Sequence, residues 1–314
     1  MTIKEKILEP ARGFLGNSRF VKIDQEQLNR LAAALADSPL PEAGNLFFPD
    51  FKSNAYFSFF INSINFCFWS RKDSPKWGIE QDGHAITGYY GFVEAAKRAF
   101  AADKRLWEPD YLSEISFEEF RRIFTGTGGE LLLFPERHEI ICENFEILCG
   151  YYVGEIERLV NSGGADINAF LDNLTRDFPS FRDQAEIPGR TLYFLKRAQL
   201  FACELARAGA PFRNVADLAV FTDYKLPQLL QAEGVLAYEE SLLAKIKAEE
   251  PLPANSDEEL EIRAATVVSC ELIRDELARL NRDLTSADLD FLLWVAAKQR
   301  QFALPHHKTM TINY

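Results

Sequence analysis

Four short segments of this chain combine charged or amide side chains with large apolar neighbours, which surface helices seldom do. They are residues 62–69 (NSINFCFW), 193–200 (YFLKRAQL), 218–228 (LAVFTDYKLPQ) and 289–294 (LDFLLW). A buried polar group needs a hydrogen-bond partner, and a buried charge needs a counter-charge. Each segment is therefore either part of a functional site or a polar piece of the core whose bonds are satisfied internally.

Asp223 has the placement most suggestive of chemistry, because it lies between Phe221 and Tyr224 where an apolar helix is expected to end. Pro227 fits the first turn of a following helix, where its missing N–H costs little. Asp223 is thus expected at or near a helix N-cap, and capping is the commonest role of such a residue. The alternative is a rigid active-site carboxylate, with Phe221 and Tyr224 enclosing a flat ring.

The other three segments leave similar alternatives open. Asp290 lies in an apolar helix, where it is either a buried acid with a raised pKa or a surface residue near the helix start. Lys196 and Arg197 interrupt another apolar helix and point about 100° apart, so one is expected to face a carboxylate or a phosphate while the other is solvated. Asn62 and Asn65 lie among large apolar residues, where amides either tie down a turn or meet a ligand.

Apolar residues with a 3.6-residue period dominate the chain and predict a mainly helical fold. The expected helices are residues 25–36, 92–102, 136–160, 167–177, 189–208, 215–220, 225–233, 238–248, 257–280 and 286–302. Residues 56–69 have a weak period and fit a strand or a short helix, with a possible small sheet there. Residues 126–129 (GTGG) predict a tight turn, since no Walker lysine follows. The linker-like residues 249–256 are too short to separate domains, so we expect a single domain over residues 1–314.

The composition excludes several classes of protein. The formal charge of −12, from 35 Lys and Arg against 47 Asp and Glu, disfavours sustained binding to nucleic acid. Five scattered cysteines without a CxxC pair indicate reduced thiols, and no apolar run has transmembrane or signal-peptide character. We therefore expect a cytoplasmic protein without membrane contact. His306 and His307 are adjacent with no third ligand in view, so we expect no metal and no cofactor.

Eight short motifs, in their order along the chain, resemble the queuosine salvage family, the queuosine 5′-phosphate N-glycosylase/hydrolases. They are INFCFW (64–69), TGYYGF (87–92), FPSFRD (178–183), FLKRAQL (194–200), VFTDYKLPQLL (220–230), EIRAATVVSCELIRD (261–275), LDFLLW (289–294) and PHHKTMTINY (305–314). The resemblance implies a fold similar to helix-hairpin-helix DNA glycosylases. It also implies an enzyme that hydrolyses the N-glycosidic bond of queuosine 5′-monophosphate and releases queuine for reuse in tRNA modification.

The resemblance also implies site residues. The family's pocket Phe and Asp fall on Phe221 and Asp223, and its Asp–aromatic pair falls on Asp290 and Phe291. N-glycoside hydrolysis develops positive charge on the sugar, which a carboxylate beside the anomeric carbon stabilises. We assign that role to Asp223, with Lys196 pairing either with it or with the 5′-phosphate. The substrate-binding residues expected are Phe221, Tyr224, Asp290, Phe291, Trp294, Asn62 and Phe48.

This chain departs from the family pattern at three positions. Val295 stands where many members carry an Asp, Asn62 stands where many also have an Asp, and Phe48 stands in place of a His. The first two departures motivate alternatives, namely a protein that binds queuine or a related deazapurine without cleaving it, or an N-ribohydrolase of a different nucleotide. A third alternative, a glycosylase acting on DNA or tRNA itself, conflicts with the net charge of −12.

Overall fold

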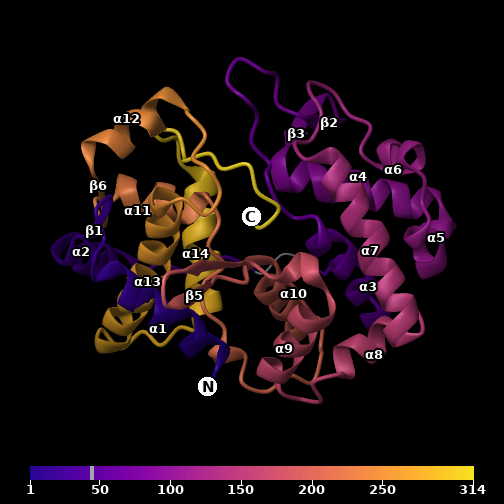
Figure 1. The fold of residues 1–314 in the computed structure, drawn as a ribbon, viewed down its shortest axis with the longest axis horizontal. Helices are drawn as coiled ribbons and strands as arrows, with labels where there is room; N and C mark the ends of the chain where they lie inside the picture. The colour runs from indigo at the N-terminus through magenta and orange to yellow at the C-terminus, as the bar shows by residue number, and fades with distance from the viewer. Residues whose placement is uncertain (43–45) are drawn as a thin grey trace.

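The computed structural model describes residues 1–42 and 46–314, and most of its helices lie in two lobes (Figure 1). The first lobe contains α3 (Phe51–Ser63), α4 (Gly88–Ala102), α5 (Pro109–Ser113), α6 (Phe117–Ile123), α7 (Phe134–Tyr152) and α8 (Ile156–Asn161). The second lobe contains α1 (Ile3–Leu15), α2 (Gln25–Leu35), α11 (Lys225–Ala232), α12 (Glu240–Ala248), α13 (Asp257–Arg279) and α14 (Ser286–Gln299). Helices α9 (Ile167–Asp177) and α10 (Lys196–Arg207) complete the body, and α10 packs against α3.

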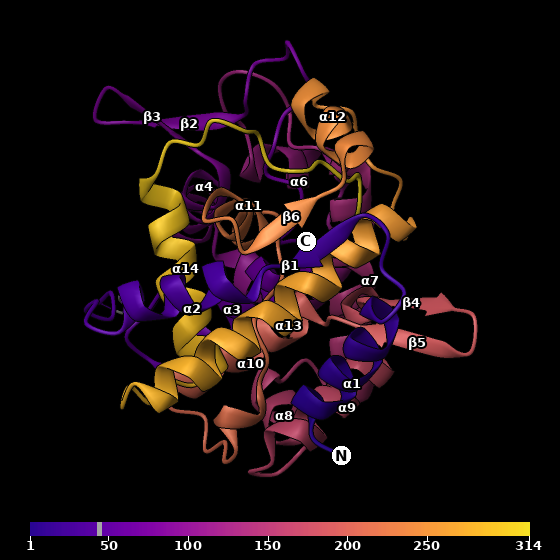
Figure 2. The same ribbon diagram turned by 90° about the vertical axis from the view of Figure 1, so that its left-hand side faces the viewer.

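Three two-stranded antiparallel sheets accompany the helices. Strand β1 (Val21–Ile23) pairs with β6 (Leu236–Tyr238), β2 (Gly78–Gln81) with β3 (His84–Thr87), and β4 (Gln184–Ile187) with β5 (Arg190–Tyr193). The β1–β6 pair ties the N-terminal segment to the second lobe, where α1 runs along α13 (Figure 2). The chain is therefore mainly helical, as predicted. Within the described residues, no helix combines the length and the apolar character needed to cross a lipid bilayer.

Helix α3 forms the centre of the first lobe. Its residues 54–63 are buried on every side, with Phe57, Phe59 and Phe60 fully covered by surrounding aromatic rings. A helix buried all round has no polar face and therefore no apolar period in its sequence. This explains why residues 56–69 fitted a strand equally well. The helix is the correct alternative for residues 56–63, whereas residues 64–69 form neither a helix nor a strand, and the small sheet lies instead at residues 78–87.

Three of the predicted helices are wrong in extent. The helix predicted over residues 136–160 breaks after Tyr152, where Val153 (φ 55°) and Gly154 (φ 70°) turn the chain into α8. The helix predicted over residues 189–208 begins as strand β5, and α10 starts only at Lys196. The helix predicted over residues 215–220 is a single 3₁₀ turn at Val215–Asp217. In each case a tertiary contact or a left-handed residue overrides a local helical pattern.

Buried cations hold the segment that follows α3. Arg137 of α7, together with Lys196 and Arg197 of α10, donates hydrogen bonds to backbone carbonyl oxygens of residues 62–66. Carbonyl groups at the end of a helix lack donors within the helix, and the helix dipole makes that end negative. Lys196 is 6% exposed and Arg197 is 1% exposed. The prediction that one of these two cations is solvated is therefore wrong.

An anion on the other side of α10 balances this positive charge. Asp183 forms a two-pronged ion pair with Arg263 of α13, with O–N distances of 2.8 and 2.7 Å, and both side chains are buried. The same carboxylate accepts the backbone N–H of Lys196 at 3.0 Å. Asp183 therefore connects the start of α10 to the long helix of the second lobe.

We expect Asp183→Ala to lower the free energy of unfolding by about 3 kcal/mol, because Arg263 would lose its main buried counter-charge. Glu259, whose Oε1 lies 3.8 Å from Nε of Arg263, remains and limits the loss. Urea denaturation monitored by circular dichroism measures the change. Glu26→Ala is the matched control, because it breaks an exposed ion pair with Arg30 on α2 and should cost no more than about 0.5 kcal/mol. Equal losses in the two variants would contradict the role of Asp183.

Candidate active site

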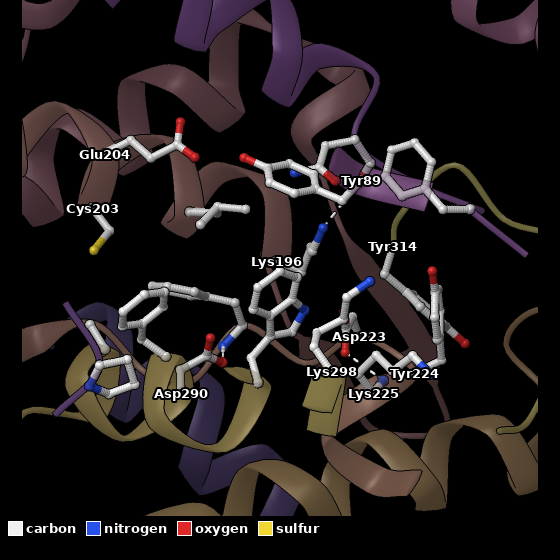
Figure 3. A pocket seen from close by; sticks show the side chains of 18 of the residues that line it. Tyr89, Lys196, Cys203, Glu204, Asp223, Tyr224, Lys225, Asp290, Lys298 and Tyr314 are labelled. Carbon is white, nitrogen blue, oxygen red and sulfur yellow. Dashed lines mark hydrogen bonds between the residues drawn. The ribbon is translucent and has the colours of Figure 1, made fainter. Parts of the chain in front are cut away.

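A cavity of about 650 Å³ lies between the two lobes, against α10. Its size falls within the range of roughly 300–1,000 Å³ typical of small-molecule sites. The wall comes from α10, α14, the turn before α11, the segment after α3, the start of α4 and the C-terminal residues (Figure 3). The predicted site residues that line it are Lys196, Phe221, Asp223, Tyr224, Asp290, Phe291 and Trp294. The cavity thus gathers side chains from segments that are far apart in the sequence.

Asp223 caps α11 and faces the cavity at the same time. Its Oδ1 accepts the backbone N–H of Lys225 at 2.6 Å and that of Leu226 at 3.3 Å. Both bonds use Oδ1, so within the described chain Oδ2 remains available to a ligand. Burial raises the pKa of Asp223, while the nearby Lys196 cation and the two backbone bonds act in the opposite direction. The two roles considered for this residue are therefore compatible, because each uses a different oxygen.

Lys196 is the cation that acts most strongly on Asp223. Its Nζ donates to the backbone oxygen of Asn65 at 3.1 Å, and the residue before it, Leu195, has a left-handed backbone (φ 53°). Burial lowers the pKa of Lys196 to about 8, and Asp223 is the largest influence that raises it. Lys196 therefore lies near enough to Asp223 for each charge to shift the pKa of the other, although no ion pair within 4.0 Å joins the two in the described chain.

Asp290 lies on α14 and is only 7% exposed. Its Oδ1 accepts the backbone N–H of Phe221 at 2.7 Å. Burial raises the pKa of Asp290 well above its ordinary value, and this bond only partly opposes the shift. Burial therefore favours the protonated form of the carboxyl, which carries an O–H donor. The interpretation of Asp290 as a surface residue is wrong.

Aromatic side chains supply flat walls. Tyr224 stacks on His306, with ring centroids 4.3 Å apart and planes inclined by 27°. Burial lowers the pKa of His306 to about 3, so this imidazole is neutral. Trp294 contacts Tyr89 edge to face at 6.1 Å, and Phe291 lies beneath the guanidinium of Arg207 at 5.5 Å. Across residues 1–42 and 46–314, no cluster of three or more His, Cys, Asp or Glu side chains has an arrangement that could hold a metal ion.

Two predicted substrate-binding residues and one departure from the family pattern lie outside this wall. Phe48 is half-buried and packs edge to face on Phe57 at 5.3 Å and on Trp107 at 5.0 Å. Asn62 is fully buried beneath the cavity. Neither of them, nor Val295, is among the described residues that line the cavity. The change at Val295 therefore removes no side chain from this wall.

Three lysines that the sequence did not single out face the cavity near Asp223, namely Lys76, Lys225 and Lys298 (Figure 3 labels the last two). Partial burial lowers the pKa of each of the three lysines. The positive charges of Lys76 and Lys298 lower the pKa of Lys225 further, so the three charges lie close together. No ion pair found within the described ranges involves any of the three. They belong to a loop, α11 and α14, so no local sequence pattern could have united them.

Glu204 of α10 is the second feature that sequence reasoning missed. Ser58 donates to its Oε2, and Asn62 Nδ2 donates to the same oxygen at 2.7 Å. Burial raises the pKa of Glu204 to about 7. Lys196, Leu200, Cys203, Glu204 and Arg207 follow the spacing of one helix face, and all of them line the cavity. That spacing is the sequence pattern that could have identified Glu204.

One family model and several known proteins are similar to this chain. The family described as "Queuosine salvage protein" matches residues 48–314. A Sphaerobacter thermophilus protein named queuosine 5′-phosphate N-glycosylase/hydrolase is 34% identical, with 98% of this chain and 97% of the relative covered. Proteins of the same name from Mus musculus and Dictyostelium discoideum are 30% and 31% identical, covering 98% and 81% of this chain and 98% and 76% of the relatives. The chain belongs to the queuosine salvage protein family.

We expect Asp290→Asn to become progressively more stable than the parent protein as pH rises from about 4, where an unfolded Asp begins to ionise. Above that pH, Asp290 of the unfolded parent is ionised, whereas Asp290 of the folded parent keeps its proton. Unfolding of the parent therefore releases a proton, and a rise in pH lowers its free energy of unfolding. The Asn side chain does not titrate and can still accept from Phe221. Urea unfolding at several pH values measures the difference. Asp283→Asn, at an exposed position, is the control, and parallel curves for Asp290→Asn and the parent would show that Asp290 is ionised in the fold.

Proposed function

We propose that this chain hydrolyses the N-glycosidic bond of queuosine 5′-phosphate and releases the base queuine. The relatives named for this activity match nearly the whole chain. The observation that carries the proposal is one cavity that the carboxyl groups of Asp223 and Asp290 and three lysines all line, with burial favouring the protonated form of Asp290. Cleavage of a nucleotide needs one group that stabilises the charge on the sugar, one that assists the leaving base and one that binds the phosphate. Asp223, Asp290 and the lysines correspond to these three needs.

Asp223 acts on the sugar in this proposal. The transition state carries positive charge at the anomeric carbon, and a carboxylate in a cavity with little water stabilises that charge strongly. The oxygen that does not cap α11 can also orient the attacking water or accept its proton. Burial raises the pKa of Asp223, and Lys196 lowers it in opposition and so favours the ionised form. Water oxygen joins the anomeric carbon, and the departing nitrogen of the base receives a proton.

Asp290 assists the departing base. A 7-deazaguanine lacks the ring nitrogen that many purine hydrolases protonate, so charge on the leaving base must be stabilised at its other edges. A neutral carboxyl donates a hydrogen bond, which strengthens as the base acquires negative charge. Phe221 and Phe291 supply aromatic surface for the base, and such stacking contributes roughly 1–3 kcal/mol per base in other proteins.

Lys76, Lys225 and Lys298 bind the 5′-phosphate in this proposal. Ammonium groups without a carboxylate partner attract an anion, and the pair formed is strengthened by charge-assisted hydrogen bonds. Lys196 is already bonded to the carbonyl of Asn65 and lies beside Asp223. This division of labour assigns Lys196 to the carboxylate and leaves the phosphate to the other three lysines.

We further propose that the protein acts in the cytoplasm on a free nucleotide and binds no nucleic acid directly. All five cysteines are unpaired, which suits a reducing compartment. The net charge of −12 opposes the accumulation of a polyphosphate at the surface.

We expect Asp223→Asn to reduce the release of queuine from queuosine 5′-phosphate by at least about 10²-fold, because a neutral amide stabilises little positive charge. The Asn oxygen can still cap α11, so the thermal unfolding midpoint should change little. Chromatography of the released base measures turnover, and calorimetry with queuine measures base binding.

Asp24→Asn is the matched control for Asp223→Asn, because Asp24 caps α2 through the same kind of bond away from the cavity. Full activity of Asp223→Asn would refute the role of this residue. Tight binding of queuine by the parent protein without any turnover would instead favour the binding-protein alternative.

We expect the double variant Lys76→Met with Lys298→Met to lose roughly 10-fold or more of the preference for queuosine 5′-phosphate over the nucleoside queuosine, from the loss of charge-assisted bonds. The ratio of the two KM values measures this preference and cancels effects on the base and sugar. Lys247→Met, at an exposed position on α12, is the control and should leave the ratio unchanged. An unaltered ratio in the double variant would place the phosphate elsewhere.

A further inference from the structure

The charges of the cavity are separated in space. Lys225 and Lys298 lie beside Asp223 at one end, and Glu204 lies at the other, with Lys196 between them (Figure 3). Asp288 also lines the cavity, but its Oδ2 accepts from the backbone and hydroxyl of Thr285 in the capping box of α14. Asp290 lines the cavity as well and accepts the backbone N–H of Phe221. Within the described chain, Glu204 is the acid of this cavity that accepts from no backbone N–H, so its carboxylate is engaged neither in capping a helix nor in holding a turn. A ligand that fits this distribution carries an anion at one end and a cation at the other.

The side chain of Glu204 is fixed in place but only half bonded. Ser58 and Asn62, both on α3, donate to Oε2. Within the described chain, no hydrogen bond reaches Oε1, and Glu204 forms no ion pair. Arg207 and Lys196 lower its pKa only partly against the effect of burial. A carboxylate in this condition gains most from a cation that bonds directly to its remaining oxygen.

We propose that Glu204 binds a protonated amine on the base of the substrate and thereby selects nucleotides whose base carries such a group. The proposal rests on the proposed function for the identity of the substrate. Queuosine fits it, because its 7-deazaguanine bears an aminomethyl substituent at carbon 7, and an alkyl amine is protonated near pH 7. The amine is attached to the base and the phosphate to the ribose, so the nucleotide carries its cation and its anion on separate parts, as the cavity carries Glu204 and the lysines.

Asn62 is a positioning residue in this arrangement. It lies beneath the cavity, and its Nδ2 holds Oε2 of Glu204 at 2.7 Å. The bond helps to fix the carboxylate rotamer and leaves Oε1 without a partner in the described chain, which lowers the entropy cost of binding a ligand. Asn62 was predicted to bind substrate, and here it acts on the substrate through Glu204.

Three nucleotides test the proposal: queuosine 5′-phosphate, 7-aminomethyl-7-deazaguanosine 5′-phosphate, which keeps the amine but lacks the cyclopentenediol, and 7-deazaguanosine 5′-phosphate, which lacks both. The parent protein should prefer the two amine-bearing nucleotides, measured as a ratio of kcat/KM values. Glu204→Gln should reduce that preference roughly 10- to 100-fold, the loss expected for a hydrogen bond between charged groups. Glu204→Asp keeps the charge and should keep part of the preference, and Glu139→Gln, at an exposed position on α7, should keep all of it.

The outcomes separate this proposal from the proposed function. A preference that follows the cyclopentenediol, or one that survives in Glu204→Gln, overturns the role of Glu204 while hydrolysis itself stands. If no nucleotide is cleaved, calorimetry with queuine and 7-deazaguanine decides the matter independently. If the parent binds queuine more tightly than 7-deazaguanine and Glu204→Gln abolishes that difference, the amine site is supported even without enzyme activity. Equal or undetectable binding of both bases overturns the amine site. A melting curve for each variant identifies any that fails to fold, and Glu204→Asp then carries the comparison.

Discussion

The backbone carbonyl oxygens of residues 62–66, at the end of a helix buried on all sides, impose the main constraint on this structure. All five residues are buried, so their carbonyl groups need protein donors, and Arg137, Lys196 and Arg197 supply them. Each of these cations in turn requires a fixed position on α7 or α10. The need to satisfy one helix end thus sets the packing of three helices and brings a lysine to the edge of the cavity.

The same constraint creates the electrostatic setting of the site. Lys196 is bound through Nζ to α3 and through its backbone N–H to Asp183, which is paired with Arg263 of α13. A lysine held this firmly cannot move away from Asp223 when a ligand enters. The carboxylate therefore meets a preorganised charge, and preorganisation is the main source of electrostatic stabilisation in active sites. Structural support and the proposed chemistry depend on the same side chain.

Sequence patterns predicted what is periodic or locally unusual. Helices with one apolar face, such as α2 and α9, have nearly the predicted bounds, and acids in apolar surroundings, Asp223 and Asp290, line one cavity. The failures share one cause, which is that the deciding contact is distant in sequence. Helix α3 lost its period because every face is covered, and the three lysines meet only after the lobes pack. The helical spacing of residues 196–207 could have placed Glu204 on the cavity face of α10, but no sequence pattern pointed to its partners Ser58 and Asn62 on α3.

The lysines at one end of the cavity are opposite in sign to the net charge of the protein, and this contrast affects the size of ligand that the cavity admits. A net charge of −12 repels an extended polyphosphate over the whole surface, whereas three lysines at one end of the cavity attract a single phosphate group. A free nucleotide brings only that one phosphate and meets the lysines without covering the acidic surface. A nucleic acid chain brings many phosphates and meets repulsion at each one beyond the cavity. The charge distribution therefore supports the proposal that the ligand is a single nucleotide.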